Sequence, residues 1–157
     1  MDPKFTSMIE ELDLKHQGLL AATGYEYKRL PPSREMPERG VYLFTENGRH
    51  LYVGRTNRIR KRLSGHCRPS GSHFTATFAF RIARERTGNL TATYSPEGSR
   101  AQLAQDPEFA AAFTAAKERL RAMEIRFVEE TDPVRQALLE IYVATVLETP
   151  YNDFDNH

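Results

Sequence analysis

The sequence predicts an α+β fold, with a small three-stranded, mostly antiparallel sheet flanked by helices. Three observations favour it. Strand-like runs occur near residues 40–54 and 122–131, helical spacing precedes and follows them, and the order of helix, strand, strand, helices, strand, helix is typical of α+β proteins. At 157 residues, without internal repeats, the chain suits one domain with its own core.

The N-terminal part predicts a helix over about Phe5–Ala22, with Met8, Leu12 and the pair at 19–20 as its apolar positions. Residues 29–40 then hold three prolines and a glycine, which break regular structure. We therefore expect residues 1–39 to form a helix and a proline-rich lead-in that pack on a domain spanning residues 40–157.

The middle of the chain predicts two strands, over about 40–45 and 49–54, followed by a helix over about 57–67. Thr56 or Asn57 is placed to cap the first amides of that helix. A further helix is expected over about Phe74–Arg84.

A turn-rich surface loop over residues 86–100 opens an expected insertion of about residues 86–120. Asp106-Pro107 starts a helix, because an aspartate cap followed by proline favours the first helical turn. Alternation of Met123, Ile125 and Phe127 predicts the third strand. A second Asp-Pro pair opens the last helix, over about 133–147.

The hairpin over residues 40–54 raises the question of whether Tyr42 and Tyr52 share a face. A two-residue turn at Asn47-Gly48 would separate them, whereas a three-residue loop over 46–48, with Gly48 in a left-handed bulge position, would place them opposite each other. The second register puts all the aliphatic residues on one face and Tyr42, Phe44, His50 and Tyr52 on the other. It is therefore the predicted one, with both tyrosines on one face.

Composition limits the classes of function. One cysteine, Cys67, excludes an internal disulfide and a cysteine-rich zinc site, and its neighbour His66 points about 100° away on a helix, which argues against a catalytic dyad. No apolar run approaches the roughly 20 residues that cross a bilayer, and the N-terminus lacks a signal-peptide core. We therefore expect a cytoplasmic protein without a membrane partner.

The net charge is only +1, but its distribution is uneven. Residues 47–84 contain no Asp or Glu and nine arginines or lysines. Such a one-sign segment in a nearly neutral chain is typical of a local binding site for a polyanion, with DNA or RNA as the commonest partner.

Two features within this pattern have both a structural and a functional interpretation. Arg58, Arg62 and His66 recur every four residues and line one helix face, which is either solvated or binds phosphates. Glu140 lies among largely apolar helix neighbours, where a carboxylate needs an arginine partner or a divalent metal.

These residues together resemble the GIY-YIG nuclease family. "GVY" at Gly40–Tyr42, "YVG" at Tyr52–Gly54, the helix residues Arg62 and His66, Glu140, and "YND" near the C-terminus occur in the family's order and spacing, with valine for isoleucine in both tripeptides. The resemblance covers about residues 40–152 and is that of a stand-alone, single-domain member. Together with the shared face of Tyr42 and Tyr52, it leads us to expect that this face looks towards Glu140.

The resemblance implies hydrolysis of phosphodiester bonds in DNA with one Mg²⁺ or Mn²⁺ ion. It assigns Tyr42 as general base, Tyr52 to orient phosphate or water, Arg62 to the phosphate, His66 to proton transfer or to holding Tyr42, and Glu140 to the metal. A free tyrosine has a pKa of about 10, so a tyrosine base needs nearby cations. Further nucleic-acid contacts are expected from Arg55, Arg58, Lys61, His73 and Asn152.

Two other classes of function remain open at this stage. One is a catalytically silent nucleic-acid-binding module that uses the basic helix over residues 57–67, and the other is a metal-free binder of small anions. RNA as the partner and formation of a homodimer also remain open, and the sequence leaves the DNA specificity undefined.

Overall fold

The computed structural model describes residues 1–89 and 99–155. The chain divides into two compact units. The first unit comprises residues 1–61 and 123–157, and the second comprises residues 62–122.

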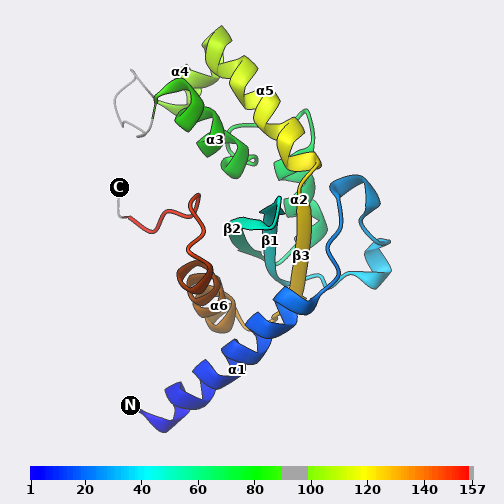
Figure 1. Ribbon diagram of the computed structural model, residues 1–157, viewed down its shortest axis with the longest axis vertical. Coiled ribbons are helices and arrows are strands. Elements are labelled where there is room, and N and C mark those ends of the chain that lie inside the picture. The colour runs from blue at the N-terminus through cyan, green and yellow to red at the C-terminus, as the bar shows by residue number, and fades with distance from the viewer. Residues whose placement is uncertain (90–98, 156–157) are drawn as a thin grey trace. The chain divides into compact units, whose positions relative to one another are not determined.

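The first unit contains the predicted sheet (Figure 1). Strands β1 (Gly40–Glu46), β2 (Arg49–Thr56) and β3 (Glu124–Glu129) form three antiparallel strands in the order β2-β1-β3. Helices flank the sheet, so the predicted α+β class is confirmed.

Helices α1 (Pro3–Ala21) and α6 (Pro133–Leu147) pack on the aliphatic face of the sheet. Both helices begin at an Asp-Pro pair, whose aspartate side chain accepts hydrogen bonds from amides of the first turn. Strand alternation places Val41, Leu43 and Val53 on one face, and burying them against both helices forms the core. The core residues are Leu12, Leu19, Val41, Leu43, Val53, Leu139, Val143 and Ala144.

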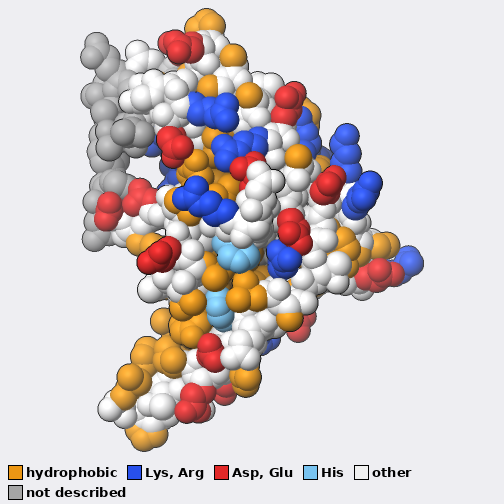
Figure 2. All heavy atoms as spheres, in the orientation of Figure 1, with side chains coloured by type: hydrophobic (Ala, Val, Ile, Leu, Met, Phe, Trp, Pro, Cys, Tyr) orange, Lys and Arg blue, Asp and Glu red, His pale blue; other side chains and the backbone are white. Residues whose placement is uncertain are grey.

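Apolar side chains of α1 also reach the surface. Figure 2 shows hydrophobic atoms along its N-terminal half, where Phe5 is exposed, as is Met1 just before the helix. In the part of the chain that the structure describes, no helix combines the length and the apolar character needed to cross a membrane.

The lead-in between α1 and the sheet forms two short 3₁₀ turns, at Tyr27–Arg29 and Ser33–Glu35. The Arg60 guanidinium fixes this segment, because Nη1 donates to the Pro31 carbonyl at 2.6 Å and contacts the Met36 sulfur at 3.3 Å.

The hairpin turn differs from the predicted three-residue loop. Asn47 and Gly48 both have positive φ, at 50° and 77°, and Glu46 pairs with Arg49, so the turn has two residues. An Asn-Gly pair favours this left-handed geometry at both central positions, and this preference outweighed the sorting of side chains from which the longer loop was predicted.

A bulge in β2 restores the separation of aliphatic and aromatic side chains onto different faces of the sheet, which the two-residue turn alone would disrupt. The register shifts between Phe44, which faces Tyr52, and Thr45, which faces His50. Leu51 is the extra residue. Tyr42 therefore faces Gly54 rather than Tyr52, yet both tyrosines share one face, with ring centroids 6.3 Å apart.

Two further expectations for the hairpin were wrong. His50 lies on the aliphatic face beside Thr45, whose Oγ1 is 2.8 Å from His50 Nδ1. The face that carries the tyrosines does not look towards Glu140, because α6 packs on the opposite face.

The second unit is helical. Helix α2 (Ile59–Cys67) begins in the first unit and ends in the second, which also holds α3 (Thr77–Thr87), α4 (Arg100–Gln105) and α5 (Pro107–Arg121). Phe80 of α3 packs against Phe109 and Phe113 of α5, with centroid distances of 4.9 and 5.7 Å. The α5 start at Asp106-Pro107 is confirmed, since Asp106 Oδ1 accepts from the Glu108 and Phe109 amides.

Helix starts in this region lie later than predicted. The Thr56 hydroxyl accepts from the Arg58 amide, and the Ile59 amide bonds Glu38, so α2 starts at Ile59 rather than at residue 57. Residues 72–75 form a hydrogen-bonded turn, which delays α3 to Thr77. Helix α4 was not predicted. The expected loop over residues 86–100 lies largely outside the described residues.

Candidate active site

Tyr42 of β1 lies against the backbone of β2 at Gly54. The tyrosine is 1% exposed, and a Cβ atom at position 54 would lie 2.3 Å from both its Cζ and its hydroxyl oxygen. A glycine is therefore required for the hydroxyl to reach this point of the sheet. The Tyr42 ring also packs edge-on to Phe44 and at a tilt to Tyr52.

Glu140 of α6 approaches the next residue of the same strand. Its Oε2 accepts from Arg55 Nε at 3.1 Å, and its side chain is 20% exposed against 47% for Arg55. Burial raises the pKa of the Glu140 carboxyl, and the Arg55 charge and hydrogen bond oppose that rise. The Tyr42 hydroxyl and the Glu140 carboxylate thus contact successive residues of β2.

Asn152 covers the outer edge of β2. Its Oδ1 accepts from the Val53 amide at 2.9 Å and its Nδ2 donates to the Val53 carbonyl at 2.7 Å. The Tyr151 amide also bonds the Leu51 carbonyl. The side chain of Asn152 therefore replaces the neighbouring strand that β2 lacks on this side, and both of its polar groups are used by the fold.

In the second unit, Arg62 of α2 is held by the turn that precedes α3. Its Nη1 donates to the Thr75 carbonyl and its Nη2 to the Thr77 hydroxyl, both at 3.0 Å. These bonds fix the plane of the guanidinium, which remains partly exposed. A fixed guanidinium plane suits the paired oxygens of a phosphate.

His66 lies one helical turn after Arg62 and is fully buried. Burial lowers the pKa of His66 to about 3, and the Arg62 charge acts in the same direction. The imidazole is therefore neutral at physiological pH. Burial also raises the pKa of the adjacent Cys67 thiol to about 12, which excludes the thiolate that a cysteine nucleophile needs.

Residues 38–108 match the family model of the GIY-YIG catalytic domain. This segment, a little under half of the chain, is similar to the GIY-YIG catalytic domain. Comparison with curated proteins and with solved structures gave no significant match.

The GIY-YIG match begins just before β1 and ends at the start of α5, so it contains Tyr42, Tyr52, Arg62 and His66. Glu140 and Asn152 follow the matched region, and their assignment depends on the resemblance and on their contacts with β2. The GIY-YIG catalytic domain is a nuclease-type fold, and proteins that carry it are generally endonucleases that use divalent metal ions.

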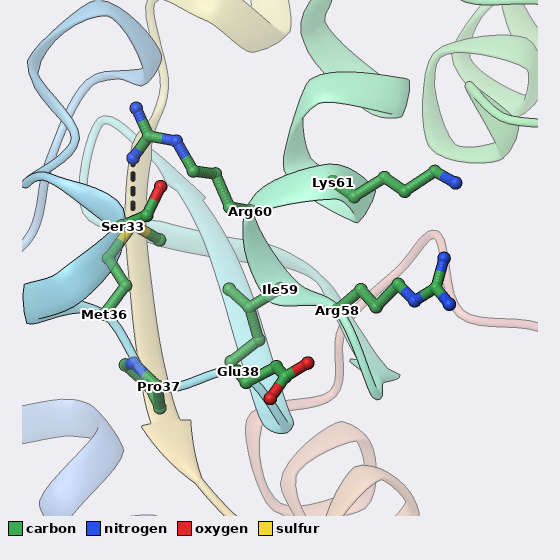
Figure 3. Close-up of a pocket in the computed structure, with 8 residues that line it drawn as sticks. All are labelled: Ser33, Met36, Pro37, Glu38, Arg58, Ile59, Arg60 and Lys61. Carbon is green, nitrogen blue, oxygen red and sulfur yellow. Dashed lines mark hydrogen bonds between the residues drawn. The ribbon is translucent and has the colours of Figure 1, made fainter.

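Three other predicted contact residues, Arg58, Lys61 and His73, fall into two groups. In the first unit, Arg58 and Lys61 extend away from Met36 and Pro37 at a cavity of about 340 Å³ (Figure 3). In the second unit, the His73 ring packs against Phe74, with centroids 4.1 Å apart.

Among the described residues, no group of three or more His, Cys, Asp or Glu side chains is arranged to hold a metal ion. The chemistry of Glu140 nevertheless fits a family-type metal. Mg²⁺ is commonly held by one or two carboxylates with water in its remaining positions, and Glu140 supplies one partly desolvated carboxylate. Arg55 is the arginine partner that the sequence left open as the alternative.

Sequence reasoning gave no structural role to three residues that shape this site. Gly54 makes room for Tyr42, and a glycine inside a strand is a signal of such close approach. Thr75 and Thr77 hold Arg62, and no sequence pattern marks them, because their bonds depend on how the turn before α3 folds.

Proposed function

We propose that this protein is a metal-dependent endonuclease that hydrolyses phosphodiester bonds in DNA. The observation that carries the proposal is that the Tyr42 hydroxyl reaches Gly54 and the Glu140 carboxylate pairs with Arg55, so that the two groups approach neighbouring residues of the edge strand β2 from opposite faces of the sheet. One strand thereby fixes a potential general base and a potential metal ligand. The close approach at Gly54 positions the first, and the ion pair with Arg55 positions the second.

Tyr42 is assigned as the general base that takes a proton from the attacking water. Its ring is held on two sides by Phe44 and Tyr52, and its hydroxyl rests on Gly54, so the oxygen has little freedom. Fixing a catalytic oxygen in this way reduces the entropy lost in reaching the transition state. Tyr52, about half-buried beside it, is assigned to orient the water or the phosphate.

Glu140 is assigned to hold one Mg²⁺ or Mn²⁺ ion. When bound, such an ion supplies charge stabilisation to the phosphoryl and leaving oxygens. Burial raises the pKa of Glu140, so its ionised carboxylate is stabilised by a cation beside it. In this structure Arg55 is that cation. When a metal ion is bound to Glu140 instead, Arg55 is available to a DNA phosphate, as are Arg58 and Lys61.

Arg62 is assigned to stabilise charge on the phosphate, since its guanidinium is permanently charged and its plane is fixed by Thr75 and Thr77. His66 is neutral, so it acts as a hydrogen-bonding group in proton transfer rather than as a second cation. The alternative function, a silent nucleic-acid-binding module, would keep the basic side chains without needing Tyr42 or Glu140.

Incubation of the purified protein with supercoiled plasmid separates the two functions. We expect nicking with Mg²⁺ or Mn²⁺ that stops in chelator, and Glu140→Gln is expected to nick at least about 10²-fold more slowly. Glu148→Gln, at the exposed C-terminal end of the same helix, is the matched control and should nick normally. A wild-type protein that shifts the plasmid band without nicking it under either metal would refute the nuclease and favour the binding module.

A further inference from the structure

Arg84 of α3 is a buried cation that forms no ion pair with an acidic residue in the described part of the chain. The residue is 9% exposed, and neither its Nε nor its Nη2 has a hydrogen-bond partner among the described residues. Leaving a buried charged donor unsatisfied is costly, so a protein normally supplies a carboxylate or a carbonyl at such a position.

The contacts of Arg84 are with an aromatic ring and with other cations. Its Cζ lies 5.3 Å from the ring centroid of Phe80, and the Cζ of Arg100, from α4, lies 5.6 Å from the same centroid. Burial lowers the pKa of Arg84, and the charges of Arg100 and Arg81 lower it further. Cation–π contacts hold the two guanidinium groups at one ring, but they leave Nε and Nη2 of Arg84 without a hydrogen-bond partner among the described residues.

We propose that Arg84 and Arg100 together bind a backbone phosphate of the nucleic acid, at a site composed only of second-unit residues. Each guanidinium presents a planar fork of donors that matches phosphate oxygens, and one phosphate has enough acceptors for both. Bound phosphate would also supply a negative charge and acceptors for Nε and Nη2 of Arg84. This inference rests on the proposed function, because it takes a nucleic acid as the ligand.

The site differs from an ordinary basic surface in that its principal cation is already desolvated. An exposed arginine must lose water to bind phosphate, whereas Arg84 has lost most of its water on folding. Arg86, two residues later on the same helix, is exposed and provides the comparison.

Binding of a short DNA duplex in chelator, followed by fluorescence anisotropy over a series of salt concentrations, tests the proposal without cleavage. For Arg84→Met and for Arg100→Met we expect the plot of log association constant against log salt concentration to become less steep by about 1. This corresponds to roughly eightfold weaker binding at about 0.1 M salt. Arg86→Met removes the same charge and should change binding less than about twofold.

Thermal denaturation of the same variants distinguishes loss of the ligand contact from loss of the fold. Arg84→Met should melt at or above the wild-type temperature, because it removes an unsatisfied buried charge. Arg84→Lys keeps the charge but not the fork, and should bind DNA with intermediate affinity.

Wild-type affinity and salt slope in Arg84→Met would overturn the inference and leave the nuclease proposal intact, since plasmid nicking tests that separately. If inorganic phosphate stabilises the wild type but not Arg84→Met, and DNA affinity is unchanged, the site binds free phosphate and the nucleic-acid assignment is wrong. The proposal is supported if the Arg84 and Arg100 variants bind DNA more weakly and with a less steep salt dependence, while Arg86→Met binds like the wild type.

Discussion

The buried histidine of α2 gives the sharpest stability prediction. His66 has a pKa of about 3 in the folded protein because it is fully buried, whereas a histidine in the unfolded chain has a pKa of about 6.5. At pH values below the pKa of the unfolded chain, the unfolded state binds a proton at His66 that the folded state does not bind. The stabilisation from neutral His66 is therefore complete above about pH 6.5 and is lost progressively as the pH falls towards 3.

The magnitude follows from the two pKa values. At about pH 5 nearly every unfolded molecule carries the proton and nearly every folded one does not, so the loss from this residue is about 2 kcal/mol. This figure changes little if the folded pKa differs by a unit, because His66 remains neutral at that pH in either case.

Urea denaturation of wild type and His66→Gln, at about pH 7.5 and about pH 5, measures the effect. Gln keeps a polar side chain but cannot titrate, so the stability gap between the two proteins should shrink by about 2 kcal/mol on going to the lower pH. Other groups, including His16 and His50, titrate in both proteins and cancel. An equal gap at both pH values would refute the assignment of His66 as a buried neutral imidazole.

Three further outcomes are expected. Glu140→Gln should gain stability relative to wild type as the pH rises through the raised carboxyl pKa, because the wild type must then ionise a partly buried group; denaturation across the acid range checks this. Gly54→Ala should lose about 1–3 kcal/mol of stability, together with cleavage, because the new methyl displaces Tyr42; melting and nicking assays report both. Asn152→Ala should lose about 1–3 kcal/mol by leaving the Val53 amide and carbonyl unpaired at the edge of β2, with amide exchange of Val53 as the direct readout.

Local signals account for the parts of the fold that the sequence predicted well. The α6 bounds follow from an Asp-Pro start and a helical apolar pattern, and the strands follow from short apolar runs between turn residues. Helix α4 was missed, since six residues hold too few apolar positions to establish a period.

The hairpin shows why a correct conclusion can follow from a wrong local structure. The aliphatic residues required Tyr42 and Tyr52 to share a face, and they do, but the protein achieves this with a two-residue turn and a bulge at Leu51 rather than with a longer loop. Both solutions satisfy the same core, so burial alone could not distinguish them.

The family pattern identified the site residues in the sequence. It could not identify the residues with which they form hydrogen bonds and ion pairs. That Arg55 pairs with Glu140, and that Asn152 completes the edge of β2, depends on contacts between residues about 85 and 99 positions apart.

Single-turnover cleavage of DNA by Tyr42→Phe protein with Mg²⁺ tests the central claim most directly. Phenylalanine keeps the ring that packs on Gly54, Phe44 and Tyr52 but lacks the oxygen assigned as the base. We predict that DNA affinity is retained and that the cleavage rate falls about 10²- to 10⁴-fold. Cleavage at the wild-type rate would contradict the assignment of Tyr42 and the account of the site built on it.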